Sequence, residues 1–274
     1  MTAMVWLDGE LVDAGSARVS ASDHGLTVGD GLFETMKVVD GTAFAITRHL
    51  RRLARTAEGL RLTPPPAHDL REAIERTVAA NGGCGRVRIT LTGGPGPAGT
   101  DRGDAAATVL VVTSAATVWP PTARVAVVPW TRNEHGALAG LKTTSYAENV
   151  IALERAHSVG AEEAIFANTQ GHLCEGTGTN VFVVSGGRLC TPPLTAGCLA
   201  GITRELVCEV VDVEEVDLPL SALADAAEAF LTSSTRDVQP IAFVDGTALP
   251  SAPGPLTSAA AGAFATLVAT TLDP

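Results

Sequence analysis

The chain contains 274 residues, of which 46% are hydrophobic and 18% are charged, and its formal net charge is −11. Such a composition is typical of one or two globular domains and excludes a fibrous or intrinsically disordered chain. Because the phosphates of nucleic acids repel a strongly acidic protein, we expect no nucleic-acid partner.

The cysteines and the N-terminal segment indicate in which cellular compartment the protein is expected. The five cysteines show no CxxC spacing, which favours buried free thiols in a reducing cytoplasm over disulfides or a metal site. The N-terminal segment lacks a basic region followed by an apolar one, and no apolar run reaches the roughly 18 residues of a membrane span. We therefore expect a cytoplasmic protein with no membrane partner and no metal.

The first part of the chain carries strand and helix patterns in turn. An Asp-Gly turn within residues 4–15 predicts a hairpin. The leucine spacing after Thr47 predicts a helix with Thr47 as its N-cap. The other predicted elements are strands over Gly31–Val39, Arg86–Thr92 and Ala107–Ser114, a helix over His68–Ala80, and a Gly- and Pro-rich loop over 93–103.

Residues 119–123 contain two consecutive prolines and predict a linker between an N-terminal domain, residues 1–118, and a larger C-terminal domain, residues 124–274. The strands predicted in the second part are Arg124–Pro129, 164–168, 172–176, 180–184 and 229–234, with a hairpin over 241–249. The predicted helices are Tyr146–Ser158, 201–211, Ser221–Ala227 and Ser258–Leu272. The mixture indicates an α+β or α/β fold.

Lysine is almost absent from this chain. Of 19 Lys and Arg residues only two are lysines, Lys37 and Lys142. Lys142 follows an apolar leucine, and desolvation of an amine makes its neutral, nucleophilic form accessible near neutral pH. A Schiff-base lysine needs this environment and arginine cannot replace it, although a lysine at the end of a surface strand is the alternative.

A carboxylate and several hydroxyls accompany this amine. Glu175 lies in an apolar, hydroxyl-rich hairpin with no cationic neighbour in sequence, so a protonated heterocyclic nitrogen would suit it. Thr203 opens a predicted helix whose first N–H groups suit a phosphate, and residues 232–235 add four hydroxyls. A solvated turn, an ordinary N-cap and a polar loop are the alternatives. Together the groups describe a site for pyridoxal 5'-phosphate.

The order and spacing of these residues closely resemble the signature of the class IV aminotransferases, the fold-type IV pyridoxal phosphate enzymes. The matching pattern is Glu175-x-Thr177-x-x-Asn180-Val181-Phe182, then Leu189-x-Thr191, then Leu199-x-Gly201-Ile202-x-Arg204. Residues 22–35 (SDHGLTVGDGLFET) and 49–53 (HLRRL) also resemble the family, in the same order along the chain.

The resemblance implies two α/β domains of the D-amino acid aminotransferase type, with the cofactor in the cleft between them, and a homodimer. It implies that Lys142 is the catalytic Schiff-base lysine and that Glu175 binds the pyridine nitrogen. The phosphate would be bound by Arg52, the backbone of Ile202, Thr203 and Ser234. Tyr146, one residue short of the family spacing, would lie near the phenolic oxygen, and Thr179 would support the ring.

The subfamily is predicted from fewer residues. Thr35 offers a hydroxyl where branched-chain aminotransferases tend to have glycine, and the segment around it resembles aminodeoxychorismate lyases. We therefore expect 4-amino-4-deoxychorismate lyase activity, which releases pyruvate and leaves 4-aminobenzoate. The alternative is a transaminase for branched-chain amino acids, D-amino acids or (R)-amines. Arg102, in the Gly- and Pro-rich loop, is the candidate for binding a substrate carboxylate.

Overall fold

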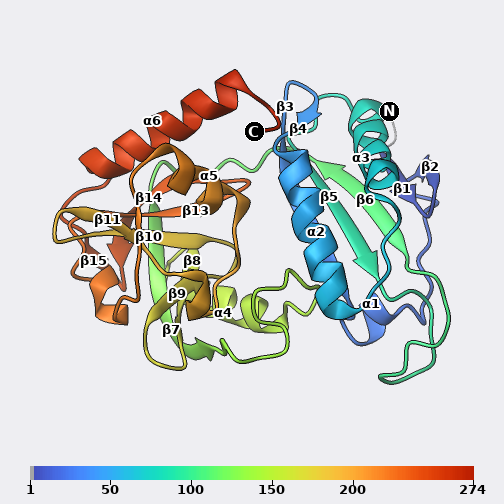
Figure 1. Cartoon of the computed structure of the whole chain (residues 1–274), viewed down its shortest axis with the longest axis horizontal. Coiled ribbons are helices and arrows are strands. Elements are labelled where there is room, and N and C mark those ends of the chain that lie inside the picture. The colour runs from blue at the N-terminus through green and yellow to red at the C-terminus, as the bar shows by residue number, and fades with distance from the viewer. Residues whose placement is uncertain (1–2) are drawn as a thin grey trace. The chain divides into compact units, whose positions relative to one another are not determined.

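The computed structural model describes residues 3–274, and these residues form two compact units (Figure 1). Unit 1 combines residues 3–117 with two short segments, Leu141–Tyr146 and Thr271–Pro274. Unit 2 comprises Val118–Gly140 and Ala147–Thr270. The chain first passes from one unit to the other between Thr117 and Val118, beside the predicted linker.

Unit 1 is built on an antiparallel sheet with the strand order β2-β1-β6-β5-β3-β4. The strands are β1 (Met4–Leu7), β2 (Glu10–Asp13), β3 (Gly31–Val39), β4 (Thr42–Ala43), β5 (Arg86–Thr92) and β6 (Val109–Ser114). Strand β5 shows why the sequence forms a sheet with one covered face. Val87, Ile89 and Leu91 alternate with polar residues, so all three lie buried on one face while the arginines and threonines lie on the other.

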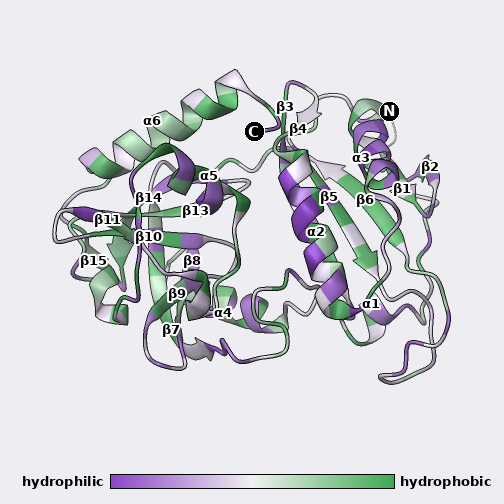
Figure 2. Cartoon of the chain, viewed as in Figure 1, coloured by the Kyte–Doolittle hydropathy of each residue, from purple (hydrophilic) through white to green (hydrophobic). Residues whose placement is uncertain are grey.

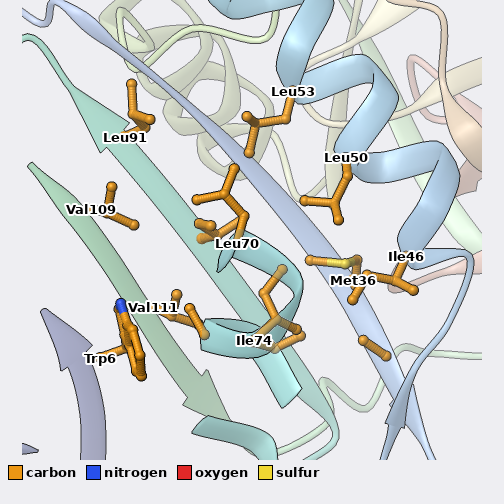
Figure 3. Packing of buried hydrophobic residues seen from close by; sticks show 14 of the residues in the cluster. Trp6, Met36, Ile46, Leu50, Leu53, Leu70, Ile74, Leu91, Val109 and Val111 are labelled. Atoms are coloured by element: carbon orange, nitrogen blue, oxygen red, sulfur yellow. The ribbon is translucent and has the colours of Figure 1, made fainter. Parts of the chain in front are cut away.

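Two helices cover that apolar face, α2 (Ile46–Leu60) and α3 (Ala67–Ala80), and a short α1 (His24–Thr27) precedes β3. Figure 3 shows Leu50 and Leu53 of α2 and Ile74 of α3 packed with Met36 of β3 in one hydrophobic cluster. The opposite face of the sheet lies outside this cluster and is called the open face below.

Helix α2 begins differently from the prediction. Thr47 is not the N-cap: Ala45, in a left-handed conformation, occupies that position and provides no side-chain cap. Instead the carboxylate of Asp273 accepts hydrogen bonds from the backbone N–H of Thr47 at 2.9 Å and from its hydroxyl at 2.5 Å. Burial tends to raise the pKa of Asp273, but the bonds from Thr47 and Arg71 hold it below its ordinary value. A residue distant in sequence thus caps the helix.

Segment 141–146, which was expected in the second domain, belongs to unit 1 because it pairs with the free edge of β3. The backbone N–H of Phe33 donates to the carbonyl of Lys142 at 3.2 Å, and that of Thr144 donates to the carbonyl of Gly31 at 2.8 Å. An isolated antiparallel bridge joins Leu32 to Thr143. Lys142 is therefore held against β3.

Unit 2 is built on a nine-stranded mixed sheet with the order β12-β11-β10-β13-β14-β7-β8-β9 and β15 added beside β14. Its strands are β7 (Ala123–Arg132), β8 (Glu163–Asn168), β9 (Leu173–Gly176), β10 (Asn180–Ser185), β11 (Arg188–Thr191), β12 (Glu214–Glu215), β13 (Ala229–Ser233), β14 (Asp237–Val244) and β15 (Thr247–Ala248). Because β9 pairs with both β8 and β10, the path from β10 through β13, β14, β7 and β8 closes on itself.

The helices of unit 2 are α4 (Ala147–Ser158), α5 (Ile202–Val210) and α6 (Pro255–Thr270), with 3-10 turns at Leu194–Ala196 and Leu220–Leu223. The predicted helix over 221–227 is only the second of these turns. Helix α6, mostly apolar in Figure 2, begins three residues before the prediction. Its first N–H groups, at Leu256 and Thr257, donate to the buried carboxylate of Glu228 at 3.1 and 2.8 Å.

Within residues 3–274, no helix has the length and apolar character needed to cross a membrane.

Candidate active site

On the open face of unit 1, the amine of Lys142 lies over an aromatic pair. Its Nζ is 4.3 Å from the ring centroid of Phe33 and 5.8 Å from that of Tyr146. The two rings meet edge to face with centroids 5.1 Å apart. The structure therefore brings together two of the predicted residues, Lys142 and Tyr146, beside the ring of Phe33.

The segment around Lys142 can approach β3 because residue 31 is a glycine. A Cβ at Gly31 would lie 2.7 Å from the carbonyl oxygen of Leu91 and 3.0 Å from the hydroxyl of Thr144. The hydroxyls of Thr144 and Ser145 both donate to the carbonyl of Gly29 at 2.9 Å. These bonds fix the backbone on the C-terminal side of Lys142.

Arg88 is a residue that the sequence argument missed. It stands directly opposite Thr35 across β3 and β5, and its guanidinium lies 3.7 Å from the centroid of Phe33. Burial lowers the pKa of Arg88 from its ordinary value, and within residues 3–274 it has no acidic ion-pair partner. The alternation of side chains along a strand could have predicted that Arg88 lies on the same face as Thr90. Its position opposite Thr35 could not be predicted in this way, because it depends on the pairing register of two strands that are distant in sequence.

Arg52, predicted to bind phosphate, makes a forked ion pair inside unit 1. Its Nε and Nη2 donate to the two carboxylate oxygens of Glu34 at 2.8 and 2.7 Å, and His49 Nδ1 lies 2.6 Å from the same carboxylate. Burial would raise the pKa of Glu34, but Arg52 and His49 hold it far below its ordinary value. Burial lowers the pKa of His49, against the raising effect of Glu34. Arg52 is thereby held in one orientation.

In unit 2, Glu175 has a cationic neighbour, contrary to the sequence argument. Arg132 Nε donates to one carboxylate oxygen of Glu175 at 3.1 Å, and the backbone N–H of Leu199 donates to the other at 2.8 Å. Arg132 is stacked on Phe166 at 4.0 Å and also donates to Asn149 at 2.9 Å. The carboxylate of Glu175 thus accepts at both of its oxygens, and each oxygen has a further lone pair that could accept from a protonated ring nitrogen.

The segments of unit 2 that carry groups predicted for the phosphate meet at Asn180. This residue is paired across the sheet with Glu175 on one side and Thr232 on the other. Its amide donates to the carbonyl of Leu199 at 2.8 Å, and a Cβ at Gly201 would overlap its side-chain oxygen. Glu175, the first turn of α5 and the end of β13 are therefore neighbours in unit 2.

Helix α5 begins at Ile202 without a side-chain cap, and its first N–H groups, including that of Thr203, are those that suit an anion. The buried hydroxyl of Thr232 has no hydrogen-bond partner within residues 3–274. Ser234 follows directly in the turn after β13. An uncapped helix start next to an unsatisfied hydroxyl is what a phosphate site requires.

Thr179, predicted to support the cofactor ring, is buried and its hydroxyl donates to Glu163 at 3.2 Å. The hydroxyl and backbone N–H of Thr177 donate to the same carboxylate. The hydroxyls of both threonines therefore donate their hydrogen bonds to Glu163.

The profile of the family described as amino-transferase class IV matches residues 31–244. The chain belongs to the class IV aminotransferases. It is 30% identical to the D-alanine aminotransferase of Listeria monocytogenes over 88% of both chains. It is also 30% identical to the bifunctional aminodeoxychorismate lyase / D-amino acid transaminase of Mycobacterium tuberculosis, over 91% of this chain and 94% of that one.

A solved structure extends the likeness to the fold. The branched-chain aminotransferase from Thermoproteus uzoniensis, determined with norvaline, superimposes with a TM-score of 0.90 and 31% identity, covering 98% of this chain and 95% of that one. The two units are thus the fold-type IV architecture that the sequence led us to expect.

Class IV aminotransferases depend on pyridoxal phosphate. The residues present fit this cofactor. Unit 1 offers a lysine amine against an aromatic pair. Unit 2 offers an ion-paired carboxylate for a ring nitrogen, and an uncapped helix start with an unsatisfied hydroxyl for a phosphate.

Arg102, predicted to bind substrate in this class IV enzyme, already donates hydrogen bonds to other groups of unit 1. Its Nε and Nη2 donate to the carboxylate of Asp30 at 2.5 and 2.6 Å, and its Nη1 donates to the carbonyls of Leu60 and Arg61 at 2.8 and 3.2 Å. The hydrogen bond with Asp30 raises the pKa of Arg102. The guanidinium thus ties the Gly- and Pro-rich loop to the C-terminal end of α2.

We expect Arg102→Gln to lower the free energy of unfolding by about 1–3 kcal/mol, because it removes charge-assisted bonds to Asp30 and to the end of α2. The KM for the amino donor should change by less than about twofold. Urea denaturation and steady-state kinetics measure the two effects, with the exposed Arg55→Gln as the control. A large rise in KM without a loss of stability would restore Arg102 as the substrate-binding residue.

Proposed function

We propose that the chain is a transaminase that takes an amino acid as amino donor and a 2-oxo acid as acceptor. The observation that carries this proposal is the pair of basic groups on Phe33: the amine of Lys142 at 4.3 Å and the partly buried guanidinium of Arg88 at 3.7 Å. An amine is the nucleophile that pyridoxal phosphate needs, and a guanidinium binds a carboxylate bidentately. A substrate with both an amine and a carboxylate uses both groups, which favours amino acids over (R)-amines.

Most of the predicted site residues have a role in this proposal; Thr179 and Arg102, which are bonded to Glu163 and Asp30, have none. Bound pyridoxal phosphate withdraws electrons from the substrate α-carbon. Lys142 is the residue that would hold the cofactor covalently, and its Nζ would move the proton at the α-carbon of the substrate. Glu175 keeps the ring nitrogen protonated. The groups assigned to the phosphate are Arg52, the backbone of Ile202, Thr203 and Ser234, while Tyr146 and Thr35 lie beside the reacting centre.

The names of the relatives favour transamination over the lyase reaction that Thr35 suggested. Two of the three are aminotransferases by name, and the third combines a lyase with a D-amino acid transaminase. The lyase stays a second candidate because that bifunctional relative is 30% identical over 91% of this chain.

Amino transfer from L-leucine, D-alanine and (R)-1-phenylethylamine to 2-oxoglutarate or pyruvate tests the proposal, beside release of 4-aminobenzoate from aminodeoxychorismate. We expect turnover of L-leucine or D-alanine. Formation of 4-aminobenzoate without any amino transfer would establish the lyase instead.

Arg88→Gln tests the carboxylate contact. Loss of a charge-assisted contact costs about 1.5–3 kcal/mol, so we expect kcat/KM for the amino acid to fall about 10- to 100-fold. Turnover of the amine, which has no carboxylate, should fall much less. Arg86→Gln, two residues earlier on β5, is the matched control. An equal loss for both classes of donor would remove this role from Arg88.

We also propose a homodimer, because three apolar side chains of unit 2, Trp130, Val150 and Ile151, are 41–58% exposed in the single chain. Analytical ultracentrifugation measures this, and a monomer at all concentrations would contradict it.

A further inference from the structure

Glu163, the first residue of β8, carries a carboxylate that is buried in unit 2 and only 2% exposed. It accepts hydrogen bonds from the backbone N–H of Thr177 at 3.0 Å, from the hydroxyl of Thr177 and from the hydroxyl of Thr179 at 3.2 Å. These three donors belong to the turn between β9 and β10, and a fourth, the backbone N–H of Ala164, donates to the same carboxylate at 3.0 Å. One carboxylate therefore fixes the turn that begins immediately after Glu175 and Gly176.

The same carboxylate reaches a second turn. Arg236 Nη2 lies 3.7 Å from Glu163 Oε2, and the backbone N–H of Arg236 donates to the hydroxyl of Ser233 at 3.1 Å. The guanidinium is stacked on Trp119 at 3.5 Å and donates to Gln239 at 2.5 Å. Arg236 Nη2 also donates to the carbonyl of Glu162 at 3.2 Å. Arg236 thus belongs to the turn that contains Ser234, and its guanidinium ties that turn to Glu162 and Glu163.

Neutralising this carboxylate would disturb both turns. A glutamine at position 163 keeps an oxygen for Thr177, but its NH2 group faces the hydroxyl of Thr179, which must turn to accept instead of donate, and the guanidinium of Arg236, which can only donate. Arg236 would lose its counter-ion and face a donor in a buried site, so the turn that contains Ser234 would move away from residue 163 and from the turn at Thr177.

We propose that Glu163 is a positioning residue that holds the turn next to Glu175 and the turn of Ser234 at the spacing needed for one cofactor molecule. Glu163 acts through these turns and has no contact of its own with the substrate. This inference rests on the roles proposed above for Glu175 and Ser234.

The test compares cofactor binding by the wild-type and Glu163→Gln apoproteins, followed by fluorescence titration. Two probes are used: pyridoxal phosphate, and pyridoxal, which lacks the phosphate. We expect pyridoxal phosphate to bind about 10- to 100-fold more weakly to the variant, the range typical of residues that orient a ligand's direct partners. The affinity ratio of pyridoxal phosphate to pyridoxal should also fall, because the phosphate turn is displaced.

Glu228→Gln is the matched control. It neutralises another buried carboxylate of unit 2, which accepts two backbone N–H groups of α6. We expect it to lower the melting temperature and leave both affinities unchanged. Unchanged affinities in Glu163→Gln, with only a lower melting temperature, would overturn the proposal.

Two further results separate the possible failures. Wild-type protein that takes up no pyridoxal phosphate would overturn the proposed function, whereas normal uptake by both proteins overturns only the role of Glu163. Should Glu163→Gln not fold, Arg236→Gln decides. It removes the ion pair with Glu163 and leaves the donors from Thr177 and Thr179 in place, so the affinity ratio is expected to fall, and an unchanged ratio counts against the inference.

Discussion

Lys142→Arg is expected to abolish transamination in a protein that still folds. The guanidinium stays protonated near neutral pH, so it neither attaches the cofactor nor accepts a proton from the substrate. The proton transfer alone is worth about 10²- to 10⁴-fold in kcat, so we expect a loss of at least about a hundredfold. The fold should persist because the positive charge against Phe33 is kept, and a guanidinium packs on an aromatic ring as well as an ammonium does.

Borohydride reduction gives a direct measurement. It should fix the cofactor to residue 142 of the wild-type enzyme, where peptide mapping finds it. The chain offers one matched control, since its only other lysine is Lys37, whose Nζ also lies over a ring, 4.7 Å from the centroid of Phe44. Lys37→Arg should keep both labelling and activity. Labelling that persists in Lys142→Arg, or that maps to Lys37, would show that the wrong amine was assigned.

Local sequence patterns predicted much of the fold and part of the candidate site. The alternation in residues 86–92 predicted a strand, and β5 is confirmed over Arg86–Thr92. The signature from Glu175 to Arg204 pointed to the family to which the chain belongs. Both signals lie within short stretches of the chain. The first is the alternation of apolar and polar side chains, and the second is a motif with many fixed positions.

What the sequence could not show depends on long-range contacts. Lys142 is followed after four residues by a helix of unit 2, and only the edge pairing of segment 141–146 with β3 assigns it to unit 1. Asp273 caps a helix that begins more than 200 residues earlier. The sequence held one indication of the role of Glu163. A glutamate at the start of a wholly buried strand must find hydrogen-bond donors inside the protein.

Glu34→Gln is expected to destabilise the fold strongly and to weaken cofactor binding. The carboxylate of Glu34 is fully buried and accepts a forked pair of bonds from Arg52 and a third bond from His49. Removing one partner of a buried ion pair costs about 3–5 kcal/mol, because the charge that stays behind loses its counter-ion. Arg52, which we assign to the phosphate, would also lose the fork that orients it.

The pH dependence follows from the same network. The folded pKa of Glu34 lies far below its ordinary value of 4.5, and that of His49 lies below its ordinary value of 6.5. In both cases the unfolded chain binds more protons than the folded one, so stability rises with pH. The wild-type protein should therefore lose stability first as the pH falls below about 6.5, when unfolded His49 takes up a proton, and further below about 4.5, when unfolded Glu34 does.

Urea denaturation at a series of pH values measures both effects. In Glu34→Gln the step below about pH 4.5 should shrink, since one depressed carboxyl pKa is gone, whereas the step from His49 should grow, because the group that raises the pKa of His49 is lost. Glu72→Gln is the control, because Glu72 forms an exposed ion pair with Arg76 at 3.2 Å in the same unit and should change stability by less than about 1 kcal/mol. If Glu34→Gln were as mild as Glu72→Gln, then Arg52 would be held by groups other than this carboxylate, and its orientation toward a phosphate would need another cause.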